Sequence, residues 1–135
     1  MSVTFNGTKP DPSVPWGTRI VRTRDEQRED SVGLNFANAN ARLFLRLLEV
    51  PGAENDELYG SLSIREAVRL VQCARASFDY RVDVLCRRAE EGRGANGCRY
   101  FSAGVDAAYF ERRLTEFADY LADWIELGAT GISWG

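Results

Sequence analysis

Apolar residues recur along this chain with two periods, and each period predicts one kind of element. Between residues 39 and 50, and again between 107 and 127, apolar side chains return every three or four positions, which predicts two amphipathic helices. A third predicted helix begins at the capping box Ser63-Ile64-Arg65-Glu66 and runs to about residue 89. A break near residues 77–79 is the alternative, because these residues are poorer helix formers than their neighbours.

Alternating apolar and polar positions predict the strands. Residues 32–36 alternate before the first helix, and residues 98–102 and 131–135 form short runs on either side of the last helix. Residues 19–30 are mostly charged and predict at best a weak strand that leads into a loop. Two strands joined by a helix through short turns are typical of a parallel right-handed crossover, so we expect a sheet that contains parallel pairing.

The first 18 residues differ in composition from the rest. They hold Pro10, Pro12 and Pro15, which disfavour both a helix and a central strand. We therefore expect residues 1–18 to form an extended N-terminal arm, in which Val3 and Phe5 make a short edge strand. The arm folds onto its own domain or, in the alternative, exchanges between subunits.

These elements define an α+β fold in which residues 19–135 form a single domain, with three helices packed on one face of a small mixed β-sheet. The predicted core consists of apolar residues from every helix and from one strand: Phe36, Leu43, Leu47, Val68, Val71, Phe78, Phe110, Leu114, Phe117 and Leu121.

The amino-acid composition limits the catalytic groups, metals and partners that we expect. The chain has no histidine, which removes the usual general base and the commonest metal ligand, so we expect no metal and no cofactor. A net charge of -3 argues against a nucleic-acid partner. The three cysteines form no paired motif, and no long apolar run occurs. These features favour a cytoplasmic protein that does not span a membrane.

Two groups of residues are candidates for binding. Asparagines at the predicted strand-to-helix turn could hold an anionic ligand with nearby arginines, although asparagine also suits caps and turns without a ligand. The ligand candidates are Asn35, Asn38, Asn40, Arg42 and Arg99. Tryptophan is enriched at interfaces but is also common in cores, and the interface candidates are Trp16, Trp124 and Trp134.

The segment Leu34-Asn35-Phe36-Ala37-Asn38-Ala39-Asn40-Ala41 and the ending Ile132-Ser133-Trp134-Gly135 resemble small uncharacterised bacterial and phage proteins with an N-x-x-N-x-N-A turn. The resemblance implies a bacterial or phage origin and no particular activity.

The function that these features favour is a non-enzymatic protein-interaction module that associates with itself as a homo-oligomer or binds a protein partner. The alternative is a sensor or sequestering protein for a small anionic ligand, such as one that acts for a phage against host defence. An enzyme that uses carboxylates or Cys98 ranks last, because no pair of groups has a diagnostic spacing.

Overall fold

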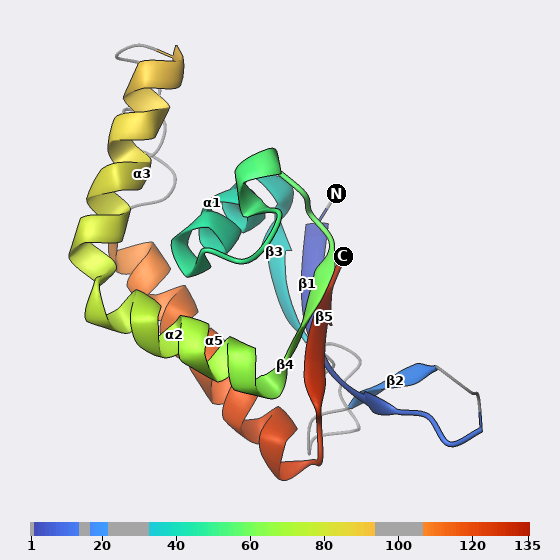
Figure 1. Cartoon of the computed structure of the whole chain (residues 1–135). Coiled ribbons are helices and arrows are strands. Elements are labelled where there is room, and N and C mark those ends of the chain that lie inside the picture. The colour runs from blue at the N-terminus through green and yellow to red at the C-terminus, as the bar shows by residue number, and fades with distance from the viewer. Residues whose placement is uncertain (1, 14–16, 22–32, 94–106) are drawn as a thin grey trace.

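The chain folds into an antiparallel five-stranded sheet with helices on one side of it (Figure 1). The computed structural model describes residues 2–13, 17–21, 33–93 and 107–135, and for 86–93 it describes the backbone alone. The elements are β1 (Ser2–Pro10), β2 (Thr18–Val21), β3 (Leu34–Ala37), α1 (Asn38–Leu48), the 3-10 turn η2 (Ala53–Asn55), β4 (Gly60–Ser63), α2 (Ile64–Ala76), α3 (Phe78–Arg93), α5 (Ala107–Glu126) and β5 (Gly131–Trp134).

The predicted α+β class is confirmed, whereas the predicted mixed sheet is wrong. Every strand pairing in the described part of the chain is antiparallel. The crossover rule relates the two strands that a helix joins, but β5 pairs with β1 and β4, which come from other parts of the chain. The strand predicted at 98–102 lies outside the described residues.

Strand β1 is central, so the prediction of an edge strand near the N-terminus is also wrong. Phe5 pairs with both β3 and β5, and Gly7 pairs with both β2 and β5. Strands β3 and β2 therefore share one edge of β1, and β5 occupies the other. Pro10 is tolerated because it is the last residue of the strand.

The helices number four in the described residues rather than three, because the predicted helix from 64 to 89 divides at Ser77. The Ser77 hydroxyl donates to the Cys73 carbonyl oxygen at 2.9 Å and accepts from Arg81 Nε at 2.7 Å. A serine side chain that bonds the preceding turn competes with the helical ladder, which accounts for the break at this position. One half of the predicted capping box is confirmed, since Ser63 Oγ accepts from the Glu66 amide at 3.2 Å. The Glu66 carboxylate accepts from the Ser63 hydroxyl at 3.3 Å rather than from the Ser63 amide.

The core lies between the sheet and helices α1, α2 and α5, while α3 extends away from the sheet (Figure 1). Phe5, at the centre, is fully buried, and its ring lies 5.3 Å from that of Phe117 and 5.6 Å from that of Phe36. Most of the predicted core residues are buried, and Leu43, Val68 and Phe78 are partly buried against them.

Candidate functional site

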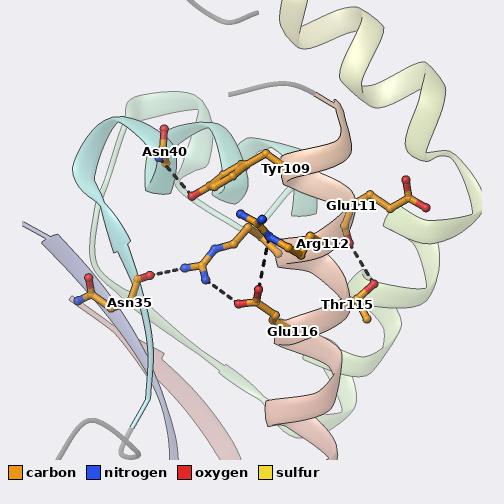
Figure 2. Close-up of polar contacts among 8 residues, drawn as sticks. Asn35, Asn40, Tyr109, Glu111, Arg112, Thr115 and Glu116 are labelled. Carbon is orange, nitrogen blue, oxygen red and sulfur yellow. Dashed lines mark hydrogen bonds and ion pairs between the residues drawn. The ribbon is translucent and has the colours of Figure 1, made fainter. Parts of the chain in front are cut away.

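The asparagine turn between β3 and α1 does not form a single ligand pocket. Asn35 Nδ2 donates to Ser2 Oγ at 3.1 Å and to Thr4 Oγ1 at 2.7 Å, so its side chain lies against β1. Asn40 Nδ2 instead donates to the Tyr109 hydroxyl at 3.2 Å, on the side of α5. Figure 2 shows these two side chains pointing to different places, and both are used to hold the fold together.

The other ligand candidates add little to this arrangement. Asparagine does not cap α1, since Ala37 is its N-cap and makes no side-chain cap hydrogen bond. Asn38 is half-buried at that end, and Arg42 is exposed on the first turn without an ion pair to another described residue. Arg99 lies outside the described residues. Ligand binding at this turn therefore stays a prediction.

The basic residue that organises this region is Arg113 of α5, which was not among the predicted ligand residues. Its Nη1 lies 2.7 Å from Glu116 Oε2, and its Nη2 donates to the Asn35 carbonyl oxygen. Its guanidinium carbon lies 4.0 Å from the centre of the Phe36 ring, within the range of a cation-π contact. The side chain is only 14% exposed. Arg113 thus connects α5 to β3 through Asn35. Figure 2 labels its two polar partners, Asn35 and Glu116.

The spacing of apolar residues in the sequence already indicated that Arg113 lies on the buried side of its helix. It is three residues after Phe110 and four before Phe117, both of which are buried, so helical geometry places it on the apolar side of α5. A charged residue on such a stripe needs a partner, and Glu116 is one turn away.

Trp124 and Trp134 belong to the core rather than to an exposed surface. Trp124 is 0% exposed and Trp134 is 6% exposed. A Cβ on Gly7 would lie 2.4 Å from Trp124 Cγ, which shows how closely α5 approaches β1. Both residues are therefore buried by their own chain and are not exposed interface anchors, while Trp16 lies outside the described residues.

A shallow cleft of about 360 Å³ lies between the end of α1, η2 and α3. Its two arginines are already engaged: Arg81 Nη1 donates to the Leu47 carbonyl oxygen at 2.8 Å, and Arg46 Nη2 lies 2.6 Å from Asp56 Oδ1. Glu49 and Glu54 also line the cleft, so its charges are mixed. These contacts close the C-terminal end of α1 and do not define one class of ligand.

A different surface, the β4 edge (residues 59–63), carries backbone groups that bond to no other described strand. The Ile64 amide donates to the Thr130 carbonyl oxygen at 3.1 Å, and antiparallel pairing alternates from there along β4. Gly60 and Leu62 therefore bond to β5, whereas the amides of Ser61 and Ser63 point away from the sheet. No other described strand pairs with this side of β4.

The pairing on the other side of β5 independently gives the same assignment of inward and outward backbone groups in β4. The Thr4 amide of β1 donates to the Gly135 carbonyl oxygen at 3.2 Å. Because hydrogen-bonding direction alternates along a strand, the backbone N–H and C=O of Ser133 then point toward β1. Those of Ile132 point toward β4, where Leu62 lies opposite. Two separate hydrogen bonds thus assign the outward direction to the Ser61 backbone.

The β4 edge lacks two of the features that usually protect an edge, although its strand is short. Its strand, Gly60–Ser63, contains no charged residue and no proline. Tyr59, which comes directly before the strand, is 69% exposed. An exposed aromatic ring beside an uncharged edge is a surface suited to pairing with another strand.

In the described residues, no group of three or more acidic or cysteine side chains is placed to hold a metal ion. None of the helices described is long and apolar enough to cross a membrane. The chain matches no known family model, and no curated protein or solved structure shows significant similarity to it.

Proposed function

We propose that the protein is an interaction module that associates with a second copy of itself through the β4 edge. The observation that carries the proposal is the outward-facing backbone of Ser61 in a strand that has no charge, proline or described neighbour on that side. This interface replaces the tryptophans that the sequence suggested as anchors, because two of them are buried.

Antiparallel pairing of two such edges gives a closed dimer. A two-fold axis at Ser61 allows each Ser61 amide to donate to the Ser61 carbonyl oxygen of the other copy. The outward amide of Ser63 then faces the Tyr59 carbonyl oxygen of the other copy, and the two sheets become continuous.

The interface is short, so the expected affinity is modest. About four backbone hydrogen bonds at about 0.5–1.5 kcal/mol each contribute about 2–6 kcal/mol in total. Partial burial of the two Tyr59 rings adds about 1–3 kcal/mol each. The contacts therefore sum to about 4–12 kcal/mol, and association itself costs at least about 4 kcal/mol, so the net free energy is at most about 8 kcal/mol. The upper half of that range, about 4–8 kcal/mol, corresponds to dissociation constants from about 1 mM to 1 μM, and this is the range that we expect.

The test is the variant Ser61→Pro. Proline removes the outward amide, while the ladder between β4 and β5 does not use that amide and should remain intact. The matched control is Ser61→Ala, which keeps the amide. We expect sedimentation equilibrium to show a reversible dimer for the wild type and for Ser61→Ala, and a monomer for Ser61→Pro with an unchanged circular dichroism spectrum.

Two results would contradict the proposal. One is a wild-type chain that stays monomeric at a concentration of about 1 mM, the upper end of the expected range. The other is a folded Ser61→Pro variant that dimerises as strongly as Ser61→Ala.

A further inference from the structure

Opposite charges lie before and after β4 in the chain. The segment before it holds Glu54 and Glu57, which are exposed and have no ion pair with another described residue. The neighbouring Asp56 is already paired with Arg46. The first two turns of α2, which follows β4, hold Arg65 and Arg69, which are likewise exposed and without an ion pair in the described part of the chain. Glu66 lies between them, and its carboxylate accepts a hydrogen bond from the Ser63 hydroxyl.

These charges have a simple relation to the proposed two-fold axis. Glu57 and Arg65 are each four residues from Ser61, on opposite sides of it. An antiparallel pair centred on Ser61 would place the end of β4 in one copy, where α2 and Arg65 follow, beside the start of β4 in the other copy, which Glu57 precedes. The two-fold symmetry repeats this arrangement. Arg69 lies one turn further along the same helix and extends the basic surface.

We infer that contacts between the acidic segment 54–57 of one copy and Arg65 and Arg69 of the other fix the direction and register of the β4 pairing. This inference rests on the proposed self-association and specifies its partner as a second copy in antiparallel orientation. Parallel pairing of the same edges would place acidic segment beside acidic segment and basic helix beside basic helix. Such pairing also lacks two-fold symmetry and would not close.

The inference predicts that association depends on salt and on the sign of these charges. Exposed ion pairs are individually weak, at about 0.2–1 kcal/mol, but the symmetric interface repeats each of them. Raising the salt from about 0.1 M to 1 M shortens the screening length from about 10 Å to 3 Å, so we expect the dimer to weaken severalfold.

The decisive experiment uses two charge-reversal variants. The first carries Glu54→Lys with Glu57→Lys, and the second carries Arg65→Glu with Arg69→Glu. Each variant alone would place like charges together in its own dimer, and we expect its dissociation constant to rise about tenfold or more. A mixture of the two restores opposite charges at both contacts, so native mass spectrometry should show a heterodimer at concentrations where each variant alone is a monomer.

A matched control separates the contact from a general effect of net charge. Arg75 is also an exposed arginine of α2, but it lies near the end of the helix away from β4. We expect Arg75→Glu to dimerise as the wild type does.

The outcomes distinguish this inference from the proposed function. If Ser61→Pro abolishes the dimer but both charge variants dimerise like the wild type, the charge contacts are refuted and the edge interface stands. If the two variants weaken association but their mixture forms no heterodimer, the pairing of these segments is also refuted. A wild-type chain that never dimerises overturns both.

Discussion

Arg112 and Arg113 are neighbours on α5, and the structure predicts very different costs for removing them. Arg113 is 14% exposed and contacts Glu116, the Asn35 carbonyl oxygen and the Phe36 ring. Arg112 is 66% exposed, and its Nε lies 3.7 Å from Glu116 Oε1. We expect Arg113→Ala to destabilise the fold strongly and Arg112→Ala to leave it almost unchanged.

The loss in the free energy of unfolding on Arg113→Ala can be estimated from the separate contacts of Arg113. A hydrogen bond from a charged donor to the Asn35 carbonyl contributes about 1.5–3 kcal/mol, and the contact with Phe36 about 0.5–2 kcal/mol. The ion pair with Glu116 adds about 0.5 kcal/mol, because that carboxylate is 38% exposed and screened by water. The buried Nε of Arg113 has no hydrogen-bond partner among the described residues, which costs about 1 kcal/mol and reduces the total.

The net loss on Arg113→Ala is therefore about 3 kcal/mol, which corresponds to a fall in Tm of about 10 °C for a chain of this length. The expected loss for Arg112→Ala is about 0.5 kcal/mol or less. Arg113→Lys keeps the charge but loses the planar fork, and we expect it to lose about half as much stability as Arg113→Ala.

Urea unfolding followed by circular dichroism measures all three variants against the wild type. Equal free energies of unfolding for Arg112→Ala and Arg113→Ala would refute the reasoning. An Arg113→Lys variant as stable as the wild type would show that charge alone, without the stacked geometry, supports this position.

Two further predictions concern the sheet and the N-terminal turn. We expect Gly7→Ala to lower the free energy of unfolding by about 1–3 kcal/mol, since its Cβ would meet Trp124 Cγ at 2.4 Å, whereas Gly135→Ala, whose nearest contact is 3.7 Å away, should leave it unchanged in urea unfolding. Hydrogen bonds from Ser13, chiefly from its side chain and secondly from its backbone amide, lower the pKa of Asp11 below 3.8. Any stabilisation of the folded state by this carboxylate is therefore present above pH 3.8 and is lost as the pH falls through the lower pKa of the folded state. An NMR titration should show this pKa rise toward 3.8 in Ser13→Ala, and an unchanged value would contradict the assignment.

The sequence predicts α1 and α5 well, because amphipathic helices carry their own pattern, whereas it does not separate α2 from α3. The apolar stripe predicted for the last helix is the buried face of α5, including Phe110, Leu114 and Phe117. The helix closes at Gly128, whose φ of 90° suits glycine and few other residues. Local signals decide these elements, so no knowledge of distant contacts is needed.

The strands are predicted less well because their positions depend on distant partners. Alternation in β1 suggests an edge strand, but a central strand also alternates when one face of an antiparallel sheet is left open. Strand β4 has no clear signal because Gly60 and two serines are poor strand formers. A Cβ on Gly60 would lie 2.5 Å from the Trp134 ring, so packing in the sheet, rather than propensity, accounts for glycine there.

The site residues show the same division between local and distant causes. Asparagine at a strand-to-helix turn predicts a helix cap. The register instead places Asn35 opposite Thr4, where its Nδ2 donates to Thr4 Oγ1 at 2.7 Å. No property of the turn itself indicates that partner. The role of Arg113 was locally visible in its position on the apolar stripe, but its acceptor on β3 was not.

At Ser61, a substitution can test the proposed interface without disturbing the fold. Its neighbours Gly60 and Leu62 hold β4 to β5, so changes to them would disturb both stability and association. The outward amide of Ser61 makes no bond to β5, and its loss should leave the sheet unchanged. A large effect of Ser61→Pro on association with little effect on stability would therefore be difficult to explain by anything except a strand that pairs across this edge.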